Sequence, residues 1–147
     1  MNVLKNLKWL GLLPVLVSLA TYSVADTIAT PYLKVAGDSV TDAVNTLLRE
    51  AENHFEAGDN EQAAAKLERA LRIDSQNAIL WHNLAGVRLQ QQDWERAASL
   101  AAKSNTFAVD NKRLRMRNWI VIALACQGMG DNDCMREAQK RARASAN

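Results

Sequence analysis

The strongest constraint on the fold is a tandem repetition with a period of about 34 residues, slightly longer before the last unit. In the stretch Ala78 to Ala98, apolar residues fall three and four positions apart, which is typical of one face of an amphipathic helix. A polar turn at Gln90 to Gln92 and a capping residue at Asp93 predict a second helix directly afterwards. Similar stretches occur one period before and one period after Trp81 and Ala97. Because one hairpin cannot bury its own apolar face, we expect three stacked hairpins.

Each hairpin combines a large apolar residue with an alanine four positions later. The three pairs are Leu47 and Ala51, Trp81 and Ala85, and Trp119 and Ala123. Antiparallel helices approach closely only where side chains are short, so these alanines predict helix contacts. Trp81 and Trp119 are therefore expected in the core, whereas Trp94 is expected on the outer side as a contact residue.

The ends of the helices are marked by capping residues and by residues that tolerate a left-handed backbone. Gly58 and Gly130 are predicted to end first helices, with Gln92 in the corresponding place of the middle unit. We expect the first helix to start at Asp38 or Ser39, and its partner to be capped by Asn60. Asp110 or Asn111 is expected to cap a third pair, over Lys112 to Met129 and Asn132 to about Ala144.

The third unit is displaced from the regular spacing by about four residues, within residues 104–118. Either the second helix of the middle unit runs on, or the loop bulges, and the sequence leaves both alternatives open. In both cases we expect the last hairpin to be offset from a regular superhelix.

The repeats resemble the tetratricopeptide repeat family over roughly residues 44 to 143. The segment ALRIDS, Ala70 to Ser75, follows the family's repeat ending, with Ser75 where proline is usual. The resemblance implies an all-α fold, an α-solenoid of three tetratricopeptide helical hairpins preceded by a signal segment and an extended linker. The expected domain covers residues 39–147, with repeats at about 44–77, 78–111 and 116–147.

The segment at residues 1–25 has the features of an export signal. Lys5 and Lys8 precede an apolar run, and Ser23 to Ala25 forms a small-residue cleavage site. The alternative is an uncleaved inner-membrane anchor, since the stretch from Trp9 to Ala25 is close to the lower limit of length for spanning a bilayer. Either way the repeats are expected in the periplasm, with membrane contact only through an uncleaved segment. Residues 26–38 are predicted to be an extended linker.

Charge is distributed unevenly along the repeats. Without Lys5 and Lys8 the chain carries 16 basic and 16 acidic residues, so its basic pI does not indicate nucleic-acid binding. Residues 38–74 carry a net charge of minus five and residues 112–147 a net charge of plus five. The basic patch consists of Lys112, Arg113, Arg115 and Arg117. It is either a solvated helix face or a contact for an acidic partner.

Few residues suggest catalysis or a bound metal. His54 and His82 are the only histidines and lie on different predicted helices, without metal-ligand spacing. Neither a phosphate-binding glycine loop nor an activated serine is present, so we expect no enzymatic activity, metal or cofactor. Cys126 and Cys134 flank the turn of the last hairpin, where they form a disulfide in an oxidising compartment or occupy two small core positions.

The family resemblance implies a concave groove lined by the first helices of the repeats. The groove positions are Leu48, Glu52, Phe55, Ile79, His82, Asn83, Leu89, Arg117, Ile120 and Leu124. Asn83 matches the asparagine that binds a ligand backbone in this family, and Arg117 falls where a basic residue often holds a terminal carboxylate. Alternatively, some of these side chains pack under a neighbouring helix.

The segments ALRID, LWHNLA and RMRNWIVIA, together with the export signal, resemble small periplasmic tetratricopeptide proteins of Gram-negative bacteria. Those proteins activate a bifunctional peptidoglycan synthase, penicillin-binding protein 1b. The resemblance implies a non-enzymatic envelope adaptor whose partner is a penicillin-binding protein. The alternative is a general assembly or chaperone-like module in secretion, polysaccharide export or outer-membrane biogenesis.

Overall fold

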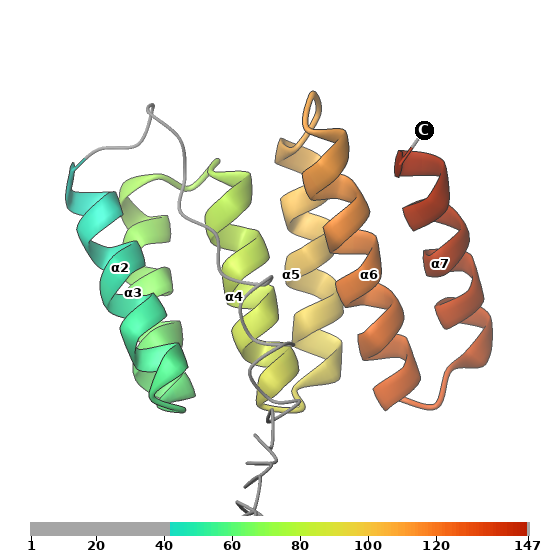
Figure 1. Cartoon of the computed structure of the whole chain (residues 1–147), viewed down its shortest axis with the longest axis horizontal. Helices are drawn as coiled ribbons and strands as arrows, with labels where there is room; N and C mark the ends of the chain where they lie inside the picture. Colours follow the sequence, from blue (N-terminus) through green and yellow to red (C-terminus); the bar gives the residue numbers. More distant parts are fainter. Residues whose placement is uncertain (1–41, 147) are drawn as a thin grey trace, which may run out of the picture.

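Residues 42–146 are described by a computed structural model and form six α-helices and no strand. The helices are α2 (Asp42–Glu56), α3 (Asn60–Ile73), α4 (Ala78–Gln90), α5 (Trp94–Phe107), α6 (Lys112–Gly128) and α7 (Asn132–Ala146). They follow one another along the long axis of the molecule, with α2 at one end and α7 at the other (Figure 1). The all-α array of three hairpins is confirmed.

The expected signal segment, the linker and the start of the first helix at Asp38 or Ser39 lie outside the described residues. Within residues 42–146, no helix has both the length and the apolar character needed to cross a membrane.

The turns inside the three hairpins share one backbone feature. Gly58, Gln92 and Gly130 have φ angles of 78°, 61° and 74°, so all three adopt the left-handed conformation. Glycine adopts this conformation without a Cβ clash, whereas a residue with a side chain is strained there. The equivalence of Gln92 with the two glycines, which the sequence predicted, is confirmed.

One of the expected caps is wrong, and the position of another is confirmed without a capping hydrogen bond. Asp59, not Asn60, is the N-cap of α3, and its carboxylate accepts a hydrogen bond from the amide of Gln62 at 3.3 Å. Asp93 occupies the N-cap position of α5 without a side-chain capping bond, and its carboxylate lies 3.6 Å from Arg96. Asn111 caps α6 as expected, through the Leu114 amide at 2.9 Å.

The four additional residues of the third unit form an extra helical turn. The loops 74–77 and 108–111 have equal length, but α6 has 17 residues whereas α4 has 13. Four residues are about one turn of an α-helix. The predicted run-on of α5 and the predicted loop bulge are therefore both wrong, since the insertion lengthens the N-terminus of α6.

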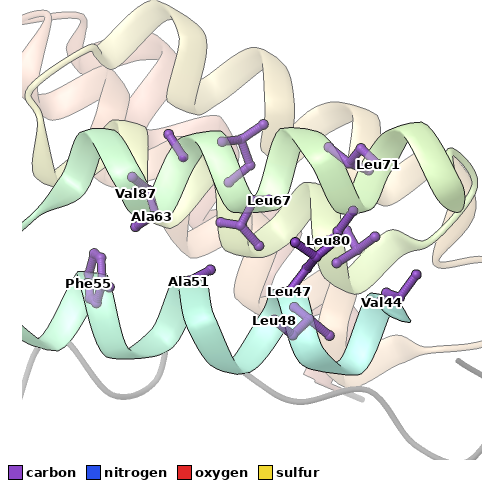
Figure 2. Packing of buried hydrophobic residues seen from close by; sticks show 13 residues of the cluster. Val44, Leu47, Leu48, Ala51, Phe55, Ala63, Leu67, Leu71, Leu80 and Val87 are labelled. Carbon is purple, nitrogen blue, oxygen red and sulfur yellow. The ribbon is translucent and has the colours of Figure 1, made fainter. Parts of the chain in front are cut away.

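A buried apolar cluster joins the first hairpin to α4 (Figure 2). It consists of Val44, Leu47, Leu48, Ala51, Phe55, Ala63, Ala64, Leu67, Ala70, Leu71, Leu80, Leu84 and Val87. A second cluster joins α4 and α5 to the last hairpin, around Val121, Cys126 and Ala138. Leu100 packs against both clusters, so the core continues through the middle of the array.

The central residues of α4 are buried all around the helix, and not only on the single face that its apolar spacing predicted. The six consecutive residues from His82 to Val87 are buried, because α3, α5 and α6 all pack against this helix. Trp81 is only partly buried, although the sequence placed it in the core. Trp94, expected as an outer contact residue, is also partly buried, and its ring lies where a Cβ on Gly128 would approach within 2.5 Å.

Hydrogen bonds between buried side chains connect three helices at the centre of the molecule. His82 Nδ1 and Asn118 Oδ1 lie 2.7 Å apart, which joins α4 to α6. The Asn118 amide donates to Ser104 Oγ at 2.7 Å and to Asn105 Oδ1 at 3.0 Å, both on α5. Ser104 in turn donates to the carbonyl oxygen of Ala78 at 2.7 Å. We call His82, Asn118, Ser104 and the Ala78 carbonyl the central polar network.

Replacing Asn118 with leucine is expected to destabilise the fold. The change removes the acceptor for His82 and the donor to Ser104, and an unsatisfied buried polar group costs about 1–3 kcal/mol. The double variant His82→Leu, Asn118→Leu removes both partners of one bond, so its loss should be smaller than the sum of the single losses. Urea unfolding followed by circular dichroism measures all three variants, and additive losses would contradict the coupling.

Replacing Gln92 with glycine is expected to stabilise the protein by roughly 0.5–1 kcal/mol, because the left-handed backbone penalises a side chain. The matched control is Gln90→Gly, since Gln90 is an exposed residue at the end of α4 whose helical backbone gains nothing from glycine. The control should lower the unfolding midpoint while Gln92→Gly raises it. A midpoint lowered by both changes would refute the strain at Gln92.

Candidate partner-binding surface

An apolar pocket of about 360 Å³ is lined by residues of α6 and α7. These two helices form the end of the array away from α2 (Figure 1). The apolar lining of the pocket consists of Met116, Ile120, Ala123, Leu124, Ala142 and Ala146. Ile120 is 41% exposed, so the pocket presents a large aliphatic side chain that a partner can reach. The pocket arises because α7 contributes two alanines opposite the larger residues of α6.

Basic side chains lie beside this pocket. Arg143 contributes to its lining. Arg113 and Arg117 precede Ile120 and Leu124 by seven residues each, so the helical period places these four residues on one face of α6. Arg113 is exposed and Arg117 is partly buried. We call the pocket with Arg113, Arg117 and Arg143 the α6–α7 surface.

Arg115 of the expected basic patch has a structural contact. Its guanidinium donates to the carbonyl oxygens of Ala108, at 2.7 Å, and of Val109. Ala108 is the C-cap residue of α5, so Arg115 ties the extra turn of α6 to the end of the preceding helix. Cations at this end of a helix are also favoured by the helix dipole. Reversing the charge of Arg115 would therefore disturb the fold, which makes it unsuitable for testing partner contacts. Lys112 is exposed at the start of α6.

The expected groove residues divide into a buried and an accessible group. Leu48, Phe55, His82 and Asn83 are at most 7% exposed. Leu48 and Phe55 belong to the first core cluster, and His82 belongs to the central polar network, so these three side chains hold helices together. The partly buried or exposed positions are Glu52, Ile79, Leu89, Arg117, Ile120 and Leu124. The structure brings Ile120 and Leu124 together in the α6–α7 surface.

Six of the residues that line the pocket were not among the binding residues predicted from the sequence, namely Met116, Ala123, Gln139, Ala142, Arg143 and Ala146. Met116 precedes Ile120 by four positions, a signal that could have placed it on the same side of α6. Ala142 and Arg143 lie on α7, and only the packing of α7 against α6 shows that they complete the pocket.

The positive charges of α7 are partly engaged within that helix. Arg141 Nε donates to Glu137 at 2.8 Å, and this hydrogen bond holds the pKa of the Glu137 carboxyl below its ordinary value of 4.5. The Arg141 guanidinium also lies 4.9 Å from the centre of the Trp119 ring, within the range of a cation–π contact. Among residues 42–146, no group of three or more metal-ligating side chains comes together.

Cys126 and Cys134 are joined by a disulfide whose Cα atoms lie 5.7 Å apart. Cys126 is fully buried in the second core cluster, and Cys134 is partly buried beside it. The bond therefore connects the end of α6 to the start of α7 across their turn. It restrains the hairpin that carries the α6–α7 surface.

Replacing both cysteines with serine is expected to lower the stability by about 2–3 kcal/mol, because the unfolded chain loses a constraint on a short loop. Thermal unfolding with and without a reducing agent measures the effect. The wild-type protein should lose stability on reduction, whereas the double serine variant serves as control and should not respond. Wild-type protein that unfolds equally under both conditions would contradict the prediction.

Comparisons with known proteins agree with this architecture. A family model described as tetratricopeptide repeat matches residues 54–116. The solved structure of the globular C-terminal domain of P. aeruginosa LpoP superposes with a TM-score of 0.69 and is 32% identical in sequence. The match covers 71% of this chain and 98% of that domain. No match is found among curated proteins. The repeat spacing, the stacked hairpins and these matches show that the chain belongs to the tetratricopeptide repeat family.

Proposed function

We propose that this protein is a non-enzymatic adaptor of the bacterial periplasm that binds and activates a bifunctional peptidoglycan synthase. The proposal combines the sequence resemblance to periplasmic activators with the likeness to the LpoP domain, which extends over 98% of that domain. The observation that carries it is the α6–α7 surface, where an exposed apolar pocket adjoins unopposed basic side chains.

The α6–α7 surface suits a partner that presents an apolar side chain close to acidic residues. An apolar centre with a polar rim is the usual arrangement of a protein interface, and its central residues supply most of the affinity. Arg113 and Arg117 form no ion pair with any other residue of 42–146, so a partner carboxylate has no internal competitor there. The charges would speed association and fix the orientation, while Ile120 and Leu124 would slow dissociation.

A non-catalytic adaptor can activate an enzyme only if it binds two conformations of that enzyme with different affinities. If the adaptor binds the active conformation of the synthase more tightly than its resting conformation, binding shifts the synthase toward activity. The size of the activation is then limited by the ratio of these two affinities. The disulfide and the central polar network support the mechanism because they keep the binding helices in one arrangement before the partner arrives.

The test uses the purified protein and a bifunctional penicillin-binding protein from the same organism. We expect the protein to bind this synthase and raise its rate of glycan polymerisation from a lipid-linked precursor. The double reversal Arg113→Glu, Arg117→Glu should weaken binding on the order of tenfold or more, since it places like charges at the contact. Calorimetry and a polymerisation assay measure the two effects.

Arg49→Glu is the matched control, because Arg49 is an exposed arginine of α2, in the first hairpin. It should leave both binding and rate unchanged, and circular dichroism should show the same helix content in every variant. Equal affinity of the double reversal and the wild-type protein would refute the role of the α6–α7 surface. Binding of unfolded reference polypeptides without any effect on the synthase would favour the chaperone-like alternative.

A further inference from the structure

A larger cavity lies in another part of the array and shares no residue with the α6–α7 surface. It opens between α3 and α5 over α4 and has a volume of about 560 Å³. Its apolar lining comes from Leu71, Trp81, Leu84 and Leu100. This volume falls in the range of pockets that hold ligands or side chains of a partner. We call it the α3–α5 cavity.

Trp81 is held in position within the α3–α5 cavity. Its indole N–H donates to the carbonyl oxygen of Ser75 at 2.8 Å, which fixes the plane of the ring. The first hairpin has the smaller Leu47 at the equivalent position, and that leucine is only 6% exposed. The tryptophan is therefore larger than the fold needs here and leaves part of its ring accessible. A rigid aromatic ring offers contact area at little cost in conformational entropy.

The charges that line the α3–α5 cavity are predominantly positive. Arg88 donates to Glu68 at 2.8 Å, so the single acidic residue of the lining is already neutralised. Arg96 is exposed and faces Asp93 at 3.6 Å, a separation typical of a weak surface pair. Arg72 forms no ion pair with any other residue of 42–146. Arg72 and Arg96 thus leave a positive surplus beside an apolar floor.

We propose that the α3–α5 cavity binds an extended segment of a partner protein, with an apolar side chain against Trp81 and a neighbouring carboxylate on Arg72. The guanidinium suits this role because it binds carboxylates through paired donors. Since Trp81 and Arg72 lie outside the α6–α7 surface, the proposal stands independently of the proposed function. Two separate sites would let the protein hold one partner at two points or connect two partners.

The test uses the purified protein and a synthetic peptide, acetyl-EDFLED-amide, which carries two apolar residues between acidic ones. The readout is the indole N–H resonance of Trp81 in proton–nitrogen spectra, assigned by its loss in Trp81→Leu. This variant is expected to fold, because leucine occupies the same position in the first hairpin. The peptide should shift the Trp81 resonance, and Arg72→Gln should weaken its binding about fivefold or more through loss of the ion pair.

Two peptides and one variant serve as controls. Acetyl-KKFLKK-amide reverses the charges and acetyl-EDAAED-amide removes the apolar anchor, so both should bind more weakly than the test peptide. Arg49→Gln changes an exposed arginine of α2 that lines neither the α3–α5 cavity nor the α6–α7 surface, so it should leave the peptide-induced shift of the Trp81 resonance unchanged. Equal binding of all three peptides would overturn the proposal, as would an unchanged Trp81 resonance at saturating peptide.

A different occupant of the α3–α5 cavity would also overturn the proposal, and each such occupant changes the Trp81 resonance in its own way. A Trp81 resonance that shifts on dilution without peptide would identify a second copy of this chain. Tyr32 and Leu33 are large apolar residues of the expected linker at residues 26–38. A Trp81 resonance that shifts without peptide in the variant Tyr32→Ala, Leu33→Ala would identify this segment of the same chain as the occupant. The proposal is supported if the Trp81 resonance does not change on dilution or in the linker variant but shifts when the peptide is added.

Discussion

The array depends on the hydrogen bond between His82 and Asn118 at its centre. Residues 82–87 of α4 are buried, so the polar side chains among them must find partners inside the protein. Asn118 is the partner of His82 and also donates a hydrogen bond to Ser104, so these side chains link α4, α5 and α6. Apolar contacts alone would tolerate small shifts between these helices, whereas directional bonds select one register. The surface formed by α6 and α7 is positioned by this central packing.

Much of the fold could be predicted because the three hairpins use the same residue types at the same helix contacts and turns. The alanines four residues after Leu47, Trp81 and Trp119 indicate close helix contacts, and the left-handed turns at Gly58 and Gly130 identify Gln92 as their equivalent. The choice of Asp59 over Asn60 as a cap was not predictable, since both side chains suit that position. Nor could the extra residues be placed, because Lys112 to Arg115 has no residue that excludes either a loop or a helix.

The binding residues were harder to predict than the fold. The sequence indicates which residues share a face of a helix, but not how closely another helix packs against that face. His82 and Asn83 were expected in a groove by resemblance, yet α6 packs against α4 and His82 bonds to Asn118. Ile120 and Leu124 lie on the first helix of the last hairpin, which only α7 covers on its far side, and they remain partly accessible. Arg115 could not be separated from its basic neighbours, because only the structure shows the carbonyl oxygens that it contacts.

The extra turn of α6 also bears on how such arrays acquire new properties. A residue inserted in the middle of a helix rotates everything beyond it by about 100 degrees, which would turn buried side chains toward water. Residues added at the N-terminus of α6 do not rotate the rest of the helix, so its buried side chains still face the neighbouring helices. The loop before α6 keeps its length. Lys112 and Arg113 are therefore added at the surface without any change in the packing of Val121 and Cys126 in the core. Helix starts are, on this view, the positions where a repeat protein can vary its surface without rebuilding its core.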